Sequence, residues 1–432
     1  MKKISAILIG AGGRGTAYST QMHMMSEKYK IIAVADPNGE KRRVIKEMFG
    51  FAEDMCFESW EDILSRPKMA DLAVITTSDH LHYAPAMKAI SLGYDILLEK
   101  PVAQTVRECT DIANAAREKG VSVLVCHVLR YTPFFNKLKR ILDSGVIGDV
   151  MSIDQTEAIG SVHFSHSFVR GNWHSEKEST PMILAKTCHD LDMIQWLIGK
   201  PCKKVSSFGS LVHFTEKNAP EGSPKQCIDG NCPHAETCPY QSERLYIKGV
   251  KGAPWKDIFK KQVATHADFS DEELREALKR TDYGLCVYHA NNDMVDNQIV
   301  NMEFADGVTA HLTVNAFNEG GRHIRIYGTK GELFAFASSK KIRVFTFEDW
   351  AWKEYPVLED GESIIGGHEG GDHGIIRDLY AYLTDSYEGN SVADIRVSVA
   401  NHLIGFAAEE ARHTDTVVMM DDYFEKNNYE NL

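Results

Sequence analysis

The stretch I-L-I-G-A-G-G-R-G-T-A-Y, residues 7–18, decides how the first part of the chain folds. It runs from an apolar segment, residues 4–9, into glycines spaced G-x-G-x-x-G. In this spacing the first glycine permits a tight turn, the second lets the backbone approach a phosphate, and the third allows close helix packing. The stretch therefore predicts a strand, a turn and a helix whose N-terminus binds a dinucleotide. The residues predicted to bind the cofactor here are Gly10, Gly12, Gly13, Arg14 and Gly15.

Asp36 ends the second apolar segment, about 20 residues beyond the glycine turn. A carboxylate at this place accepts hydrogen bonds from ribose hydroxyls and repels a 2′-phosphate, so NAD is favoured over NADP. Arg14 and the basic run at residues 41–43 weaken that preference, unless they form a solvated helix face.

Residues 1–126 alternate short apolar segments with stretches suited to helices. Strands are predicted at residues 4–9, 31–35, 72–75, 96–98 and 121–125. Their continuous apolar character is typical of strands covered on both faces, and the alternation predicts a doubly wound parallel sheet of the Rossmann type. Ligands bind outside the carboxyl ends of such strands. Further cofactor-binding candidates at these ends are Thr76, Thr77, Ser78, His82, Glu99 and Lys100.

Residues 127–432 show a different sequence pattern, in which apolar and polar residues alternate along the predicted strands. Strands are predicted at residues 151–157, 204–214, 299–304, 308–315, 324–327 and 342–347, and helices at 184–198 and 373–413. These elements predict a second α/β domain with an open, mostly antiparallel sheet. A cysteine-containing insertion is expected at about residues 215–295, with 226–252 as a loop.

Four motifs together resemble the Gfo/Idh/MocA family of NAD(P)-dependent sugar and polyol oxidoreductases. They are Gly10-x-Gly-x-x-Gly15, Asp36, Thr76-Thr77-x-x-His80-x-His82 and Glu99-Lys100-Pro101. The resemblance covers essentially the whole chain and is strongest over residues 1–130. It implies NAD as cofactor, a carbohydrate substrate and a homo-oligomer.

By this resemblance, Lys100 contacts the reacting hydroxyl and Glu99 lies near the nicotinamide. Hydride transfer from a carbinol leaves a developing alkoxide, which a nearby ammonium stabilises. The resemblance also assigns His189, in a His-x-x-Asp pattern with Asp192, as the partner acid or base. Inositol-dehydrogenase-like members carry an aspartate where this chain has Ala185, so Lys186 is the candidate replacement. Two neighbouring amines would lower each other's pKa.

Further substrate-binding candidates are Arg130, Tyr131, Arg170, Trp173 and Asp192. Arg130 and Tyr131 follow the fifth predicted strand, where the family places a substrate-side arginine and tyrosine. Arg170 and Trp173 combine a donor with an aromatic ring, which is typical of carbohydrate sites. An ordinary loop with a packing tryptophan is the alternative.

The insertion carries Cys227, Cys232, His234 and Cys238, which could supply a tetrahedral zinc site. The spacing matches no standard zinc motif, so a cysteine-bearing insertion without metal is favoured. Nine cysteines, an odd number in a long chain, do not indicate a disulfide framework.

Composition narrows the function classes. The net charge of −13 argues against nucleic acid and anionic membranes as partners. There is no apolar run of the roughly 20 residues that span a bilayer, and we expect a cytoplasmic protein. The leading hypothesis is an NAD-dependent oxidoreductase acting on a secondary hydroxyl of a sugar, polyol or glycoside. The alternatives are a glycosidase that oxidises its substrate transiently and a non-catalytic NAD-binding regulator.

Overall fold

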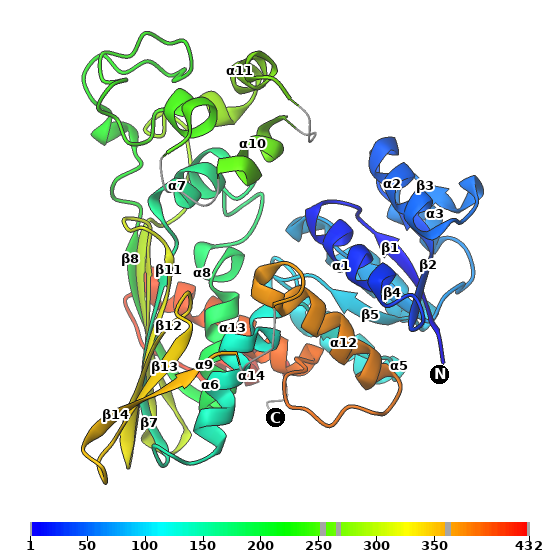
Figure 1. The fold of residues 1–432 in the computed structure, drawn as a ribbon, viewed down its shortest axis with the longest axis vertical. Helices are drawn as coiled ribbons and strands as arrows, with labels where there is room; N and C mark the ends of the chain where they lie inside the picture. Colours follow the sequence, from blue (N-terminus) through cyan, green and yellow to red (C-terminus); the bar gives the residue numbers. More distant parts are fainter. Residues whose placement is uncertain (1, 251–255, 265–268, 359–363, 430–432) are drawn as a thin grey trace.

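The computed structural model describes residues 2–250, 256–264, 269–358 and 364–429. The two predicted sheets are both present and lie in separate parts of the molecule (Figure 1). Residues 251–252 of the predicted loop lie outside the described residues. So do other residues of the insertion, 253–255 and 265–268, and the last residues of the chain, 430–432. Within the described residues, no helix combines the length and apolarity needed to cross a membrane.

The first sheet is parallel, with the strand order β3-β2-β1-β4-β5-β6. Its strands are β1 (Ile4–Ile9), β2 (Tyr29–Ala35), β3 (Cys56–Phe57), β4 (Leu72–Ile75), β5 (Asp95–Leu98) and β6 (Val123–Val125). This order confirms the doubly wound Rossmann fold. The sequence analysis missed β3, because a two-residue strand carries no periodic signal. The helices of this part are α1 (Gly13–Met24), α2 (Gly39–Phe49), α3 (Trp60–Leu64), α4 (Tyr83–Leu92) and α5 (Val106–Lys119).

The second sheet follows the order β14-β13-β12-β11-β7-β10-β9-β8-β15. Its strands are β7 (Val150–Ala158), β8 (Cys202–Ser210), β9 (Asn297–Phe304), β10 (Thr309–Asn315), β11 (Gly321–Gly328), β12 (Gly331–Phe336), β13 (Lys341–Thr346), β14 (Ala351–Pro356) and β15 (Val418–Met419). The pair β7–β10 is parallel and the other pairs are antiparallel, which confirms the mostly antiparallel prediction. The strand predicted at 204–214 ends earlier, at Ser210.

Helices separate this second sheet from the first domain (Figure 1). They are α6 (Pro133–Asp143), α8 (Met182–Ala185), α9 (Cys188–Ile198) and α13 (Ile395–Thr414), with α14 (Met420–Lys426) at the β15 end. The helix predicted at 184–198 is therefore wrong as one continuous element, because it breaks at Lys186 and Thr187. The Thr187 hydroxyl donates to the Ile183 carbonyl, 2.9 Å away, and ends the first piece.

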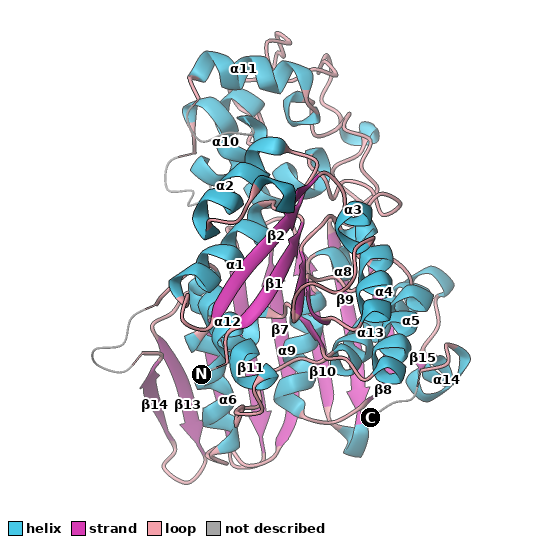
Figure 2. Ribbon diagram, turned by 90° about the vertical axis from the view of Figure 1, so that its right-hand side faces the viewer, coloured by secondary structure: helices cyan, strands magenta, loops and turns pink. Residues whose placement is uncertain are grey.

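The helix predicted at 373–413 is also two helices, α12 (Gly371–Leu383) and α13. Asp385 adopts a left-handed backbone conformation after α12, and Asp394 caps α13 through the Val397 amide. α12 packs against α1 and brings a segment of the C-terminal part onto the first domain (Figure 2). The domain division at residue 126 remains a prediction, and the packing adds this returning helix to the first domain.

The insertion is more helical than predicted. Within it, a helical turn at Glu243–Lys248 lies in the segment predicted as a loop, and α10 (Lys256–Ala264) and α11 (Asp271–Arg280) follow. These elements enclose a small apolar core of their own, which includes Tyr246 and Leu274. Figure 1 shows them at the end of the molecule farthest from β14.

The turn between β1 and α1 has steric demands that predict a stability difference. A Cβ at Gly15 would lie 2.1 Å from the Gly10 carbonyl oxygen, whereas no atom of the described residues lies within 4 Å of one at Gly12. Gly15→Ala should therefore lower the free energy of unfolding by about 1–3 kcal/mol. Gly12→Ala is the matched control and should change it far less. Equal effects in urea unfolding would contradict this reading of the turn.

Candidate active site

The glycine turn follows β1 and is held against the end of β4. Gly10 has φ +92, and a Cβ there would lie 2.7 Å from the Thr76 carbonyl oxygen. The Thr76 hydroxyl donates to the Gly10 carbonyl at 2.6 Å. Thr76, predicted as a cofactor ligand, is thus used to hold the turn in shape.

The start of α1 is suited to an anion. Gly12 is its N-cap residue and makes no side-chain capping bond, and the first turn carries no acidic residue. The free amides of this turn and the open space beside Gly12 and Gly13 fit a pyrophosphate. Asp36 flanks the turn, with its carboxylate accepting from the Ala11 and Asn38 amides at 2.8 Å each. These residues fit a bound NAD.

Glu99 is buried where β5 ends, at 5 % exposure. Its carboxylate accepts from Arg14 Nε at 2.7 Å, from the Tyr18 hydroxyl at 2.8 Å and from the Lys100 amide at 2.8 Å. Burial by itself would raise the pKa of Glu99, but the Arg14 guanidinium, the charge of Lys100 and the Tyr18 hydroxyl together lower it. A negative charge is therefore held beside the glycine turn.

Arg14 also joins the first domain to α12. Its guanidinium donates to Asp372 at 2.7 Å and contacts His368 Nδ1 at 2.9 Å. Burial opposes ionisation of Asp372, but hydrogen bonds from His368 and Arg14 lower its pKa to about 2. Because two carboxylates engage this guanidinium, the group of Arg14 that can meet a phosphate is its backbone amide. The argument that its side chain favours NADP is thereby weakened.

Lys100 reaches from the end of β5 to the second domain. Its Nζ donates to the Ala185 carbonyl at 2.9 Å, at the point where α8 ends. A continuous helix would commit that carbonyl to the His189 amide. The break before α9 frees it and brings Lys100, Lys186 and His189 to one place.

Lys186 belongs to a row of alternating charges that the sequence analysis missed. Its Nζ lies 3.4 Å from Glu157 on β7, and Arg322 on β11 lies 2.8 Å from Glu157 and 2.9 Å from Asp190. Burial lowers the pKa of Lys186 and raises that of Glu157. Lys100 also contributes to the low pKa of Lys186, as the predicted pairing of amines requires.

His189 lies in the first turn of α9 with a neutral imidazole. Burial, followed by the charge of Lys100, lowers its pKa well below 6.5. Its Nδ1 makes no hydrogen bond to the described residues. The ring meets His127 edge to face with centroids 5.9 Å apart, and His127 meets His402 at the same separation.

Two of the predicted substrate residues pair with each other. Arg130 donates to Asp192 through Nε at 2.7 Å and Nη2 at 2.6 Å, and Asn401 of α13 donates to the same carboxylate at 2.6 Å. All three side chains are buried, and so is Tyr131. This cluster sets the position of α9 and therefore of His189.

The remaining predicted residues are spread around the domain junction. Trp173 Nε1 donates to Asp79, 3.2 Å away in the first domain. Arg170 donates to the carbonyls of Leu285 and Tyr240 in the insertion, at 2.7 and 2.8 Å.

Three of the first-domain candidates are tied to local backbone. The two ring nitrogens of His82 lie 2.7 Å from the Pro101 carbonyl and 3.1 Å from the Thr77 carbonyl. Thr77 donates its hydroxyl to Leu81, and Ser78 precedes the short helical turn after β4.

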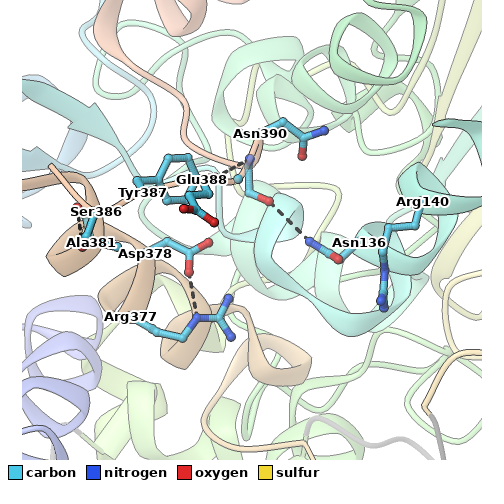
Figure 3. A pocket seen from close by; sticks show the side chains of 11 residues that line it. Asn136, Arg140, Arg377, Asp378, Ala381, Ser386, Tyr387, Glu388 and Asn390 are labelled. Atoms are coloured by element: carbon cyan, nitrogen blue, oxygen red, sulfur yellow. Dashed lines mark hydrogen bonds and ion pairs between the residues drawn. The ribbon is translucent and has the colours of Figure 1, made fainter.

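A cavity of about 520 Å³ lies elsewhere, between α6 and the segment after α12 (Figure 3). Its lining includes Asn136, Arg140 and Tyr387, and none of the predicted site residues. The volume of this cavity therefore does not identify it as the active site.

The parallel sheet with its glycine turn and buried Glu99–Lys100 strand end defines a nucleotide-dependent oxidoreductase. Family models agree: residues 4–127 match the NAD-binding Rossmann fold of an oxidoreductase family, and residues 139–355 match its C-terminal alpha/beta domain. The chain belongs to the Gfo/Idh/MocA oxidoreductase family, and its first domain is an NAD-binding domain.

Relatives and solved structures extend the comparison. The oxidoreductase YteT of Bacillus subtilis, itself named putative, is 26 % identical over 83 % of this chain and 84 % of its own length. A 2,7-anhydro-N-acetylneuraminate hydratase of Escherichia coli is 28 % identical, over 48 % of this chain and 53 % of that protein.

Two crystallised proteins share the fold. A levoglucosan dehydrogenase with NADH has a TM-score of 0.70 at 17 % identity, covering 97 % of this chain and 99 % of its own. Scyllo-inositol dehydrogenase of Lactobacillus casei has a TM-score of 0.63 at 16 % identity, covering 97 % and 100 %.

The buried Arg130–Asp192 pair predicts a large loss of stability on truncation. Asp192→Ala leaves the Arg130 guanidinium buried without its partner, which should cost about 3–5 kcal/mol in urea unfolding. Asp422→Ala, at an exposed position of α14, is the matched control. If Asp192 instead contacts substrate, stability stays near wild type and KM rises.

Proposed function

We propose that this protein is an NAD-dependent oxidoreductase that moves a hydride between a secondary hydroxyl of a sugar, polyol or glycoside and nicotinamide. The observation that carries the proposal is the hydrogen bond from Lys100 to Ala185. It holds an ammonium group between the nucleotide side of the first domain and the helix that carries His189. The names of relatives support the substrate class, since they include inositol dehydrogenases and a levoglucosan dehydrogenase.

In the oxidation direction, NAD⁺ held by the glycine turn and Asp36 would supply the acceptor for the hydride that leaves the carbinol carbon. The hydroxyl proton passes to the neutral imidazole of His189. Lys100 stabilises the oxygen as negative charge develops on it, and a carbonyl product remains. The balance is one alcohol and one NAD⁺ giving one ketone, one NADH and one proton.

The residues around these two groups keep them ready for this chemistry. Burial and the charge of Lys100 keep His189 neutral, which is the form that accepts a proton. Glu157 and Arg322 hold Lys186 beside them. In keeping with the family resemblance, we also propose that the protein acts in the cytoplasm as a homo-oligomer.

Replacing Lys100 tests its proposed role. Lys100→Met should lower kcat/KM by about 10²–10⁴-fold, because one charged group that stabilises the transition state is lost. NAD affinity, measured by fluorescence titration, should stay near wild type. Lys88→Met, at an exposed position of α4, is the control. The assay is a carbohydrate library followed by NADH fluorescence, and full activity of Lys100→Met would refute the role.

The charges around His189 predict the pH dependence. The imidazole of His189 must be neutral to accept the proton. We therefore expect kcat/KM to be at its maximum above the pKa of His189 and to fall as the pH drops through that pKa. Because that pKa lies well below 6.5, the acidic limb should lie below pH 6.5. Lys186 contributes to the low pKa, so Lys186→Met should move the limb to higher pH. Lys217→Met, exposed and distant in the insertion, should leave it in place. A limb unmoved in Lys186→Met would exclude this coupling.

A second candidate is transient oxidation, in which NADH formed in one step is reoxidised before release. Oxidising a ring hydroxyl acidifies the neighbouring C–H bond and permits elimination of a leaving group. The observation that favours it is the neutral imidazole of His189, a proton acceptor, close to the Lys186–Glu157 ion pair, together with the hydratase relatives.

The two candidates differ in their stoichiometry. Transient oxidation predicts elimination or cleavage of a glycoside, seen by chromatography, without accumulation of NADH. One NADH per molecule of substrate, with the glycosidic bond intact, would exclude it. Tight NAD binding without turnover of any carbohydrate would favour a regulator instead.

A further inference from the structure

All four cysteines of the insertion converge on one small cavity. They are Cys227, Cys232, Cys238 and Cys286. The other five cysteines of the chain lie outside the insertion. Residues 227 and 286 are distant in the sequence, so their meeting results from the fold rather than from a local repeat.

Backbone pairing holds the first and last of these cysteines together. The Cys227 amide donates to the Gly284 carbonyl at 2.8 Å, and the Cys286 amide donates to the Lys225 carbonyl at 2.9 Å. Gln226 and Leu285 form the bridge between them. This short antiparallel pair brings both sulfur atoms to the same cavity.

A tight loop returns the chain to the cavity at Cys232. Asp229 and Asn231 have φ of 54 and 51, and a Cβ at Gly230 would lie 1.9 Å from the Gln226 carbonyl oxygen. One further turn, closed by the Cys238 amide on the His234 carbonyl at 2.9 Å, brings in the fourth cysteine.

We propose that these four cysteines bind one Zn²⁺ ion as thiolates. Four sulfur ligands select zinc or an iron–sulfur cluster over harder metals. The cavity volume of about 20 Å³ is close to that of one water-sized sphere, which leaves room for a single ion. The Ser242 amide already donates to Cys227 Sγ at 3.3 Å, the kind of contact that orients a metal thiolate.

The ligand set differs from the one considered in the sequence. His234 also lines the cavity, but its Nε2 lies 2.8 Å from the Glu221 carbonyl oxygen. We therefore assign Cys286, and not His234, as the fourth ligand. In the structure, the cysteines are free thiols. Among the described residues, no three His, Cys, Asp or Glu side chains are arranged to hold an ion. Closing the site requires rotations about Cα–Cβ bonds, which leave the paired backbone where it is.

The ion would stabilise the insertion where it contacts the segment that carries Arg170 and Trp173. Arg170 donates to the carbonyl of Leu285, next to Cys286, and to that of Tyr240, two residues beyond Cys238. Trp173, three residues along the chain from Arg170, donates across the domain junction to Asp79. A zinc ion would therefore stiffen the insertion and the segment that carries Trp173, without taking part in the reaction.

Metal analysis of the full-length chain, purified under reducing conditions, tests the proposal. Wild type should contain about one zinc per chain, the stoichiometry of a single four-thiolate site. Cys56→Ser, which changes a partly exposed cysteine of the first domain, should keep the zinc. Cys227→Ser/Cys286→Ser removes one ligand from each side of the backbone pair and should lose it.

Cobalt titration of wild type keeps the test valid if the double variant does not fold. After zinc is removed by a chelator, one equivalent of Co²⁺ should produce thiolate-to-metal absorption. The proposal is overturned if wild type neither holds zinc nor shows this absorption, if the double variant keeps its zinc, or if iron is found in place of zinc. A disulfide between any two of the four cysteines in the reduced preparation would also overturn it.

Discussion

A charged group that leaves water must find a partner of opposite charge, and this constraint orders the junction between the two domains. Arg14 joins Glu99 of the first domain to Asp372 of α12. Arg130, in the segment that follows the first domain, pairs with Asp192 of α9. Each pair connects segments distant in the chain, so the geometry of the site depends on these pairs forming together.

The interruption between α8 and α9 has the largest chemical consequence. A continuous helix would have used its carbonyl groups internally and left Lys100 without an acceptor on the second domain. The break gives Lys100 the carbonyl of Ala185 and puts His189 in the first turn of a new helix. Burial and the adjacent ammonium then keep the imidazole neutral. The break between α8 and α9 is thus the place where Lys100 of the first domain and His189 of the second come together.

The parts of the fold that sequence could predict are those with local signals. The glycine turn, the five predicted strands of the first sheet and the mostly antiparallel character of the second sheet depend on neighbouring residues. The break at Lys186 and Thr187 was missed, and so was the contact of Lys186 with Glu157 on β7, which joins residues distant in the sequence. The charge row with Asp190 and Arg322 was missed for the same reason, since no spacing rule connects residues on different elements.

The sequence by itself determined the fold class, the family and the nucleotide turn, because steric needs at Gly10 and Gly15 and strand polarity are local properties. The tertiary structure decided which side chains remain available for chemistry. It joined Arg130 to Asp192 and Arg14 to two carboxylates, and it left His189 Nδ1 without a hydrogen-bond partner among the described residues. It also brought Cys286, which is distant in the sequence, to the cavity lined by Cys227, Cys232, His234 and Cys238. These outcomes depend on contacts between residues distant in the sequence. In the protein interior, where water is excluded and the dielectric constant is low, such hydrogen bonds and ion pairs are strong and a buried polar group without a partner is costly.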